Sequence, residues 1–396
     1  MINKAPAVTT KTSLSICLVS HGHLCSNSGQ HVYSIAKELA GYGYRIALCI
    51  PRNSEQKQNR QEDIDIFSFN EYLDVVGERP PVLVHLWTPR ESIRKFYLKL
   101  ISVCTFNIPY IVHLEDNEMC ILQEHANVSA QDIKDVMLGK NTIAVPDHCT
   151  HPLHGKLFIE NANGLTSLIS SLTAALPASQ PKATFWPGFD ASFAVQRSAD
   201  ELSNFRSSLN LPDDVYITAY TGNVHQSNVE EVRSLYIAVA LVNRMGVPLK
   251  LIRTGKDFVS LSEHGDDVLH KHTVELGIVS QGDLPKILQL TDILIQPGKV
   301  DEWNSYRVPS KLPEYLISGR PVILPEVNLG KILKNNEEAL ILNAANAEQI
   351  AAMLIEWLPR KRDRALIGLN GAKFAKKHLN WSVATKIIND LYFKII

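Results

Sequence analysis

The residues with the clearest chemical meaning lie between Arg307 and Ile323, where a lysine and a glutamate stand one turn apart at the start of an apolar helix. Lys311 follows Ser310 directly, and Glu314 comes three positions later. The free N–H groups and the dipole of a helix N-terminus favour an anion such as phosphate. A carboxylate one turn further can accept both hydroxyls of a ribose. This spacing suits a nucleotide sugar, and an ordinary Lys/Glu pair on a surface helix is the alternative.

A second group of candidates lies at the end of the strand predicted at Tyr110–Leu114. His113 is part of this strand end, and three carboxylates follow it closely at Glu115, Asp116 and Glu118. Such side chains can hold the hydroxyls of an acceptor, and we expect His113 and Glu115 to be the catalytic pair. A solvated turn is the alternative.

Arg90 is a further candidate because it follows another predicted strand, Val82–Trp87. Thr88 can cap the next helix, and Pro89 suits its first position. Arg90 can then contact an acceptor or a phosphate, and we assign it with Glu118 to the acceptor side. A solvated arginine at a helix start is the alternative.

The elements that must position these residues alternate between strands and helices. Short apolar runs predict the strands, and apolar residues at helical spacing predict the helices. The first series is a strand at Ser15–Ser20, a helix at Gln30–Ala40, strands at Arg45–Ile50 and Val82–Trp87, a helix at Glu91–Cys104, a strand at Tyr110–Leu114, a helix near Asn163–Leu176 and a strand at Ala183–Trp186.

A second alternating series begins near residue 215. It consists of a strand at Val215–Tyr220, a helix at Val229–Arg244, strands at Leu249–Arg253 and Asp292–Gln296, a helix at Ser310–Ser318, strands at Pro321–Leu324 and Ala339–Leu342, and helices from Glu348 onward. The two series predict an α/β protein with two doubly wound, Rossmann-like domains, residues 1–195 and 215–375, joined by a linker at 196–214. Ligands of such sheets bind at the carboxyl ends of the strands, so the loops there carry the most weight.

The segment from Arg307 to Ile323 resembles the donor-site segment of retaining glycosyltransferases with the GT-B fold, of the group 1 or family 4 type. Trp186–Phe193 resembles the signature that ends the first domain of that family. The resemblance implies two doubly wound domains that face a cleft, one on the acceptor side and one that binds the nucleotide sugar. It also implies that the last helix, 376–396, crosses back to the first domain.

The resemblance assigns roles to single residues. Lys311 and Arg307 would hold phosphate, Glu314 the ribose, and His113 the transferred sugar. Gly29, in a loop with one glycine where the family has two, would let the donor approach the backbone. The implied reaction moves a sugar from a nucleotide-diphosphate-sugar donor to an acceptor hydroxyl, with retention at the anomeric carbon and without a metal or other cofactor.

One segment departs from the family pattern. Tyr220–Asn228 stands where the family has Gly-Arg-x-x-x-x-Lys; its glycine is Gly222, but Asn223 and Asn228 replace the two cations that grip the diphosphate. Each missing cation removes a charge-assisted contact worth roughly 1.5–3 kcal/mol. Compensation can come from other cations at strand and helix ends, namely Arg253, Lys256, Arg307 and Lys311.

A second departure is Tyr306, which stands where the family has the first glutamate of a Glu-x7-Glu pair that ends at Glu314. Both departures leave other interpretations open. One is a non-catalytic GT-B protein that binds or scaffolds a glycosyltransferase. The other, less favoured, is a nucleotide-sugar epimerase, which needs carboxylates for proton transfer.

Composition limits the possible partners. The net charge of −1 gives no field to hold nucleic acid or an anionic membrane, so membrane contact is expected only at the periphery. The six cysteines lie within residues 17–149 without metal-ligand spacing, which suits free thiols in a reducing compartment. The first twelve residues are polar, and no apolar run reaches the ~20 residues of a membrane span. We expect a cytoplasmic protein without a metal that acts on glycan, lipid-linked or small-molecule acceptors, in polysaccharide or glycoconjugate synthesis.

Overall fold

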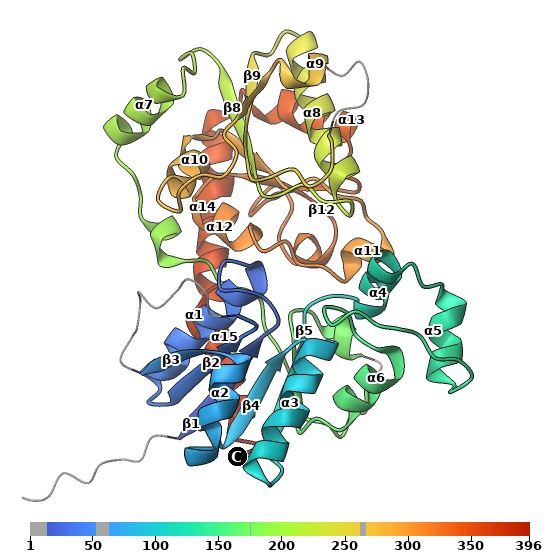
Figure 1. The fold of residues 1–396 in the computed structure, drawn as a ribbon. Coiled ribbons are helices and arrows are strands. Elements are labelled where there is room, and N and C mark those ends of the chain that lie inside the picture. Colours follow the sequence, from blue (N-terminus) through green and yellow to red (C-terminus); the bar gives the residue numbers. More distant parts are fainter. Residues whose placement is uncertain (1–13, 53–62, 175, 262–266) are drawn as a thin grey trace, which may run out of the picture. The chain divides into compact units, whose positions relative to one another are not determined.

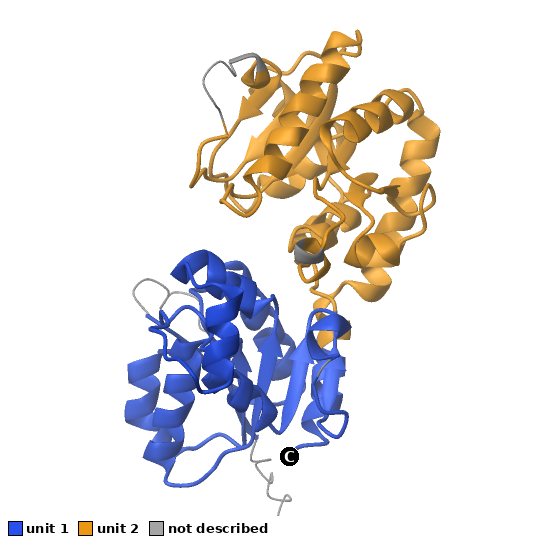
Figure 2. Ribbon diagram, turned by 90° about the vertical axis from the view of Figure 1, so that its right-hand side faces the viewer, with its two compact units in different colours: residues 1–185, 385–396 blue, residues 186–384 orange. Residues whose placement is uncertain are grey.

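The computed structural model describes residues 14–52, 63–174, 176–261 and 267–396. The chain forms two compact units: unit 1 is Met1–Phe185 with Thr385–Ile396, and unit 2 is Trp186–Ala384 (Figure 2). The segment 196–214, predicted as a linker, contains helix α7 (Ala199–Ser208) and lies in unit 2. The helix forms there because Ser198 caps it by accepting a hydrogen bond from the N–H of Glu201.

Unit 1 contains a seven-stranded parallel sheet in the order β3-β2-β1-β4-β5-β6-β7 (Figure 1). Its strands are β1 (Ser15–Ser20), β2 (Arg45–Ile50), β3 (Ile64–Ser68), β4 (Leu83–Trp87), β5 (Tyr110–Leu114), β6 (Gly164–Ser167) and β7 (Lys182–Thr184). Its helices are α1 (Asn27–Gly41), α2 (Phe69–Val75), α3 (Glu91–Cys104), α4 (Glu118–Ala126), α5 (Ala130–Met137) and α6 (Pro152–Glu160), with most of α15 (Trp381–Tyr392). The central strands are buried on both faces, which explains their nearly continuous apolar sequences.

Unit 2 contains a six-stranded parallel sheet in the order β10-β9-β8-β11-β12-β13. The strands are β8 (Tyr216–Thr221), β9 (Leu249–Thr254), β10 (Thr273–Glu275), β11 (Ile293–Ile295), β12 (Val322–Pro325) and β13 (Leu340–Leu342). The helices, besides α7, are α8 (Val229–Arg244), α9 (Asp267–His270), α10 (Leu284–Leu290), α11 (Glu302–Ser305), α12 (Leu312–Ile317), α13 (Ala347–Trp357) and α14 (Lys361–His378).

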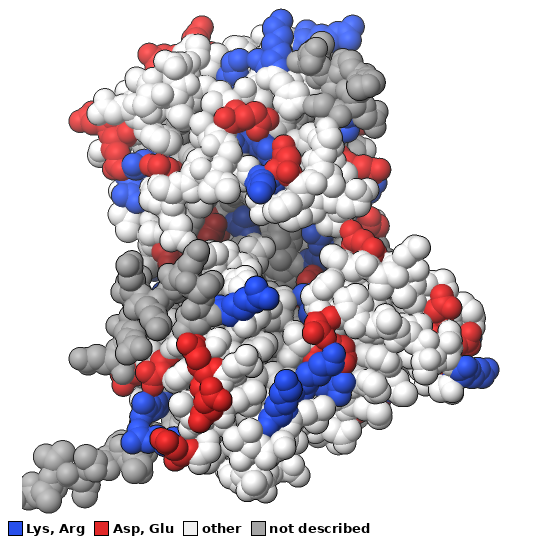
Figure 3. Space-filling model, in the orientation of Figure 1, with Lys and Arg blue, Asp and Glu red and all other residues white. Residues whose placement is uncertain are grey.

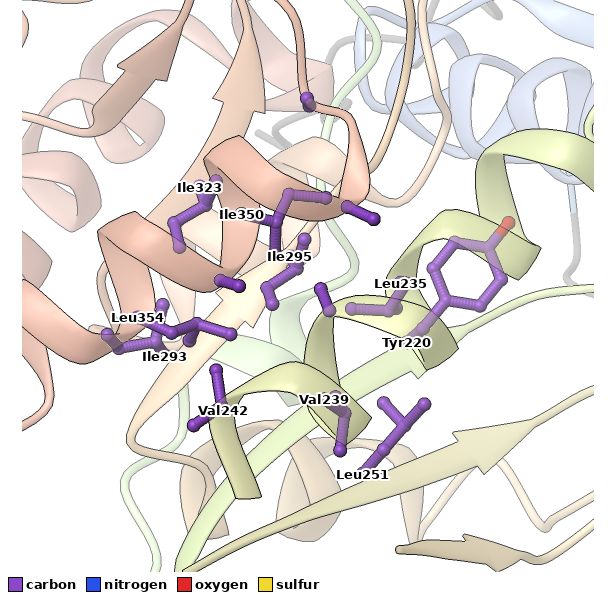
Figure 4. Close-up of a cluster of buried hydrophobic side chains, with 14 of the residues drawn as sticks. Tyr220, Leu235, Val239, Val242, Leu251, Ile293, Ile295, Ile323, Ile350 and Leu354 are labelled. Carbon is purple, nitrogen blue, oxygen red and sulfur yellow. The ribbon is translucent and has the colours of Figure 1, made fainter. Parts of the chain in front are cut away.

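The core of unit 2 is packed between this sheet and two of its helices. Figure 4 shows Leu235, Val239 and Val242 of α8 beside strand residues such as Ile293 and Ile295. Residues of α13 belong to the same buried cluster. This packing holds β8 and β11, which are neighbours in the centre of the sheet. From β8 the sheet continues to one side with β9 and β10, and from β11 it continues to the other side with β12 and β13. In such sheets ligands bind beyond the carboxyl ends of the strands at this position.

The structure confirms the predicted α/β fold but corrects one element. The helix predicted near Asn163–Leu176 is wrong, because the segment forms strand β6 (Gly164–Ser167) and a short 3-10 helix, Ser170–Thr173. Four residues are too few to show a strand period in the sequence. The pairing of β6 with β5 decides the outcome, since it aligns Thr166 with His113 in the sheet.

The surface carries both signs of charge. Figure 3 shows lysines and arginines interspersed with acidic residues on the visible face, in keeping with the net charge of −1. Within the described ranges, no helix is long and apolar enough to cross a membrane. The polar N-terminal segment considered above, up to Thr12, lies outside the described residues.

Candidate functional site

The sequence-predicted site residues fall into two groups, one in each unit, and each group lies around the carboxyl ends of central strands. Unit 1 holds Gly29, Arg90, His113, Glu115 and Glu118. Unit 2 holds Gly222, Asn223, Arg253, Lys256, Arg307, Lys311 and Glu314.

In unit 2 the structure brings Lys311 against the loop that follows β8. A Cβ at Gly222 would stand 2.5 Å from the Lys311 Nζ, and the φ of +143° at this glycine is one that other residues rarely adopt. The same Nζ lies 3.8 Å from the centre of the Tyr220 ring. A cation–π contact therefore holds the ammonium over a glycine backbone. A phosphate could approach both groups there.

Glu314 lies one turn from Lys311, as the spacing predicted, and its environment is unusual. Burial raises the pKa of the Glu314 carboxyl to about 8, and the charge of Asp190 acts in the same direction, while Lys311 opposes it. Asp190 accepts hydrogen bonds from the N–H and the hydroxyl of Ser192. Near neutral pH the Glu314 carboxyl is therefore largely protonated and can both donate and accept hydrogen bonds with a diol.

Asn223 and Asn228, which stand where the resemblance implies two cations, both brace loops. Asn223 Oδ1 accepts a hydrogen bond from the N–H of Lys256 at 2.8 Å. Asn228 accepts from the N–H of His225 at 2.8 Å and donates to the carbonyl of Asn223 at 3.1 Å. Their side chains fix the loop beside Gly222 and bring no charge to it.

Arg253 and Lys256, named as compensating cations, differ in their surroundings. The buried Arg253 guanidinium donates to the carboxylates of Asp257 and Glu275, and Glu275 also accepts from Tyr236. These partners neutralise Arg253, so its charge stabilises the loops around β9 by pairing with their carboxylates. Lys256 is exposed, and its Nζ lies 5.4 Å from the centre of the Phe258 ring.

Arg307 differs from these two cations because it lines a small pocket beyond β11 and β12. The pocket is lined, among others, by Gln296, Asn304, Arg307, Leu312 and Asn328. Asn304 donates to the carboxylate of Glu231 at 2.8 Å. Burial raises the pKa of Glu231, and the hydrogen bond from Asn304 and the charge of Arg307 oppose this effect. Arg307 thus helps to balance a partly buried carboxylate.

In unit 1, Glu115 is the centre of a buried hydrogen-bond group. It accepts from the hydroxyl of Ser28 and from Nε1–H of Trp87, both at 2.6 Å, and the Nδ1 of His31 lies 3.5 Å from it. Burial alone would raise the pKa of the Glu115 carboxyl, but side-chain hydrogen bonding, that of His31 first, lowers it well below its usual range. The carboxylate is ionised and already occupied by protein donors.

His113 lies beside it, with its ring packed against two aromatic side chains. The ring stacks on Trp87 at 3.8 Å and on Phe185 at 5.2 Å between centres. Its Nδ1 is 2.8 Å from the hydroxyl oxygen of Thr166, and its Nε2 is buried with no hydrogen-bond partner within the described residues. Burial lowers the pKa of His113 well below its usual value. The side chain is a neutral imidazole with one unsatisfied nitrogen.

Arg90 and Glu118 form a buried ion pair. Arg90 donates from Nε and Nη2 at 3.1–3.3 Å, and the hydroxyl of Thr150 donates to Glu118 at 2.6 Å. Burial alone would lower the pKa of Arg90, but Glu118 raises it. The predicted cap by Thr88 is wrong: α3 begins at Glu91, and Thr88 has a φ of +80° with a buried hydroxyl.

Local packing explains why residue 29 is a glycine. A Cβ there would stand 2.0 Å from the carbonyl oxygen of His23 and 2.8 Å from the Cα of Leu24. Its N–H donates to Ser26, the cap of α1. The loop thus folds tightly over the first turn of the helix, and the approach of a donor to Gly29 stays a prediction.

Sequence reasoning missed several polar partners in unit 1, namely Ser28, His31, His85, Trp87 and Thr166. His85 and Thr166 are polar residues within short apolar runs, at positions that are fully buried. Buried polar groups need partners. That signal could have identified them before the structure.

The comparisons with known proteins agree with this architecture. The family model described as Glycosyl transferases group 1 matches residues 216–359. A search of curated protein sequences gives no match.

Among solved structures, sucrose-phosphate synthase from Thermosynechococcus elongatus is similar at a TM-score of 0.71 and 14% identity, over 96% of this chain and 98% of that one. The Anabaena protein HepE in complex with UDP and glucose has a TM-score of 0.67 and 12% identity, over 96% and 100%. A glycosyltransferase from Rickettsia africae has a TM-score of 0.69 and 12% identity, over 97% and 99%. Residues 216–359 therefore match the model of the glycosyl transferases group 1 family, and the chain has the fold of GT-B glycosyltransferases.

Proposed function

We propose that the protein transfers a sugar from a nucleotide-diphosphate-sugar donor to an acceptor hydroxyl, with retention at the anomeric carbon and without a metal. The observation that carries the proposal is the position of Lys311 over the glycine backbone at Gly222, inside the segment matched by the group 1 family. HepE, a structural relative, has been seen with UDP-glucose, which supports a nucleotide sugar as the donor.

The residues of unit 2 would hold the nucleotide part of the donor. Lys311 would neutralise charge that develops on the departing diphosphate, which is the help that a metal gives in other enzymes. Glu314 would bind the ribose hydroxyls. Arg307 would add positive charge at the neighbouring pocket, while Asn223 and Asn228 would keep the loop in shape.

The residues of unit 1 would hold the sugar and the acceptor. The free Nε2 of His113 would bond to a hydroxyl of the transferred sugar. Glu115 would keep the surrounding rings in place, because its oxygens are already occupied by Ser28 and Trp87. The Arg90–Glu118 pair would lie on the acceptor side. The free cysteines suit a reducing compartment, so we propose a cytoplasmic role in glycan or glycoconjugate synthesis.

The test is donor cleavage by the purified full-length protein. UDP-, GDP-, ADP- and dTDP-sugars would be supplied in turn, and free nucleotide diphosphate measured. We expect release from one donor, reduced about 10–100-fold by Lys311→Ala through loss of a charge-assisted contact. Glu314→Ala should weaken the same donor. Lys376→Ala, at an exposed lysine on α14, is the matched control and should have no effect.

A non-catalytic binding partner is the second candidate, and the uncharged Asn223 and Asn228 are the observation that favours it. A donor that raises the melting temperature without being cleaved would support this candidate. A free epimer of the sugar as product would instead indicate an epimerase. No cleavage and no stabilisation by any donor would contradict the proposed transferase.

A further inference from the structure

Four buried polar side chains of unit 1 form a continuous hydrogen-bonded chain that ends at His113. The hydroxyl of Tyr392 lies 2.8 Å from Nδ1 of His85. Nε2 of His85 lies 2.8 Å from the hydroxyl oxygen of Thr166, which in turn lies 2.8 Å from Nδ1 of His113. All four side chains have no exposed surface.

The sheet and the last helix build this chain together. Thr166 on β6 pairs in register with His113 on β5, and His113 pairs with Trp87 on β4. His85 stands two residues before Trp87 and therefore on the same face of the sheet. Tyr392 comes from the end of α15, where an edge contact with Tyr44 steadies its ring. The four groups are thus fixed by pairing and packing.

The positions of the hydrogens in this chain can be counted. Burial lowers the pKa of both His85 and His113, so each imidazole is neutral and carries one N–H. Tyr392 and Thr166 each add one O–H. Four hydrogens serve three links, and each link needs one. Three orders satisfy all the links. Two of them run in opposite directions along the chain. In the third, both imidazoles donate to the Thr166 oxygen, which can accept twice, and the Thr166 hydroxyl hydrogen and the Nε2 of His113 stay unbonded.

In the first order each group donates toward Tyr392. Both imidazoles then carry the hydrogen on Nδ1, the hydroxyl hydrogen of Tyr392 has no acceptor in the chain, and the Nε2 of His113 is a bare acceptor. In the second order each group donates toward His113. Tyr392 then donates to His85, both imidazoles carry the hydrogen on Nε2, and the one unsatisfied donor is the Nε2–H of His113.

The second order leaves fewer buried groups without a partner. It satisfies the phenol hydrogen, while the first order leaves both that donor and the imidazole nitrogen unbonded, and the third leaves both the Thr166 hydrogen and that nitrogen unbonded. An unsatisfied buried donor or acceptor costs free energy, so the second order is favoured. A phenol is also a better donor to an imidazole nitrogen than the reverse, because phenol is the stronger acid.

We propose that Tyr392, His85 and Thr166 are positioning residues that hold His113 as its Nε2–H tautomer, so that it donates a hydrogen bond to a hydroxyl oxygen of the transferred sugar. The sugar role rests on the proposed function, whereas the tautomer does not. Stacking of the His113 ring on Trp87 and Phe185 fixes its plane, and the hydrogen-bonded chain fixes its hydrogen.

The test is nitrogen NMR of the full-length protein labelled with ¹⁵N only at histidine. Protonated and unprotonated ring nitrogens resonate at well-separated shifts, and loss of signals in His113→Asn and His85→Gln identifies the two rings. We expect both rings to be protonated at Nε2 and unprotonated at Nδ1. Protonation of either ring at Nδ1 would overturn the proposal.

Two variants test the chain itself. Tyr392→Phe removes the phenol hydrogen and leaves the first two orders with equal numbers of unsatisfied groups, so a second set of ring signals, protonated at Nδ1, should appear for His85 and His113. Thr166→Val removes the link between the rings, and the Nδ1 resonance of His113 should move toward that of an unbonded nitrogen. Thr166→Ser keeps the hydroxyl and should retain the wild-type signals.

A single unchanged set of signals in Tyr392→Phe would contradict the role of Tyr392, and unchanged Nδ1 resonances in Thr166→Val would contradict that of Thr166. These outcomes need no donor, so they remain separate from the proposed transfer reaction. Failure of the donor panel with an Nε2–H His113 would reject the transferase alone. With a cleaved donor, Thr166→Val should lower kcat/KM more than Thr166→Ser.

Discussion

In unit 1 the candidates His113 and Glu115 are buried and bonded to neighbouring side chains, whereas in unit 2 Lys311 lies against an aromatic ring and a glycine backbone. Glu115 and His113 are held by rings and hydroxyls from neighbouring strands. Lys311 is held by one aromatic ring and the space that Gly222 leaves open. Replacing a buried side chain such as Glu115 disturbs the core of unit 1. Replacing Lys311 can change ligand binding without changing the stability of unit 2.

The largest expected effect follows from this contrast at Glu115. Glu115→Ala leaves Trp87 and Ser28 without their acceptor and removes the carboxylate beside His31. We expect the free energy of unfolding to fall by about 3–5 kcal/mol. Urea denaturation measures it. Glu160→Ala, at an exposed glutamate of α6, should change stability little, and an equal loss in both variants would contradict the contrast.

Gly222→Ala should give the next largest effect, on the donor site. The new Cβ would collide with Lys311 Nζ and stands at a φ that alanine rarely adopts. We expect donor cleavage to fall about 10–100-fold, as for Lys311→Ala, because the ammonium loses its place. Gly246→Ala is a control for backbone strain alone, since its φ is +85° with nothing near its Cβ position. An equal loss of activity in both variants would contradict a role for the contact between the Gly222 position and Lys311.

Arg253 sharpens the comparison within unit 2. Its carboxylate partners indicate that Arg253→Ala will lower stability by about 1–3 kcal/mol, because Glu275 and Asp257 lose a charged donor. The affinity for the nucleotide diphosphate found in the panel should change little. Calorimetric titration of that nucleotide distinguishes the two roles. A large loss of affinity with unchanged stability would restore Arg253 to the donor site.

The effect of Glu314 on stability should appear as a pH dependence. Its pKa in the folded protein, about 8, is above that of an ordinary glutamate. The stabilisation from its protonated form is therefore complete below about pH 4 and is lost as the pH rises toward and through 8. Glu314→Gln should flatten the fall in unfolding free energy between pH 5 and 9. Parallel curves for the two proteins would contradict the raised pKa.

The sequence predicted the central strands well because they are buried on both faces and read as apolar runs. β1, β2 and β5 have the predicted bounds. The short strands at the sheet edges, β3 and β10, were missed, since they have few buried residues. Strand β6 was mistaken for part of a helix because pairing with β5, and not its own four residues, determines its conformation.

The position of the candidate residues was predictable where they lie at strand ends or one helical turn apart. His113 follows from its place in β5, and Lys311 with Glu314 from their separation. The partners that fix His113 come from β4, β6 and α15, which lie far apart in sequence. No local pattern relates them. Whether a cation such as Arg253 is free or neutralised also depends on loops that only the structure brings together.

The return of the chain to unit 1 has a consequence for its synthesis. Residues from Thr385 onward complete unit 1, although all of unit 2 precedes them on the chain. A ribosome therefore makes most of unit 1 first and supplies Tyr392 only after unit 2, while domains otherwise tend to fold as they emerge. Until that final helix arrives, His85 and Tyr44 lack the partners they have in the finished protein. The nascent first unit therefore keeps part of its polar interior without partners until the residues after unit 2 have been translated.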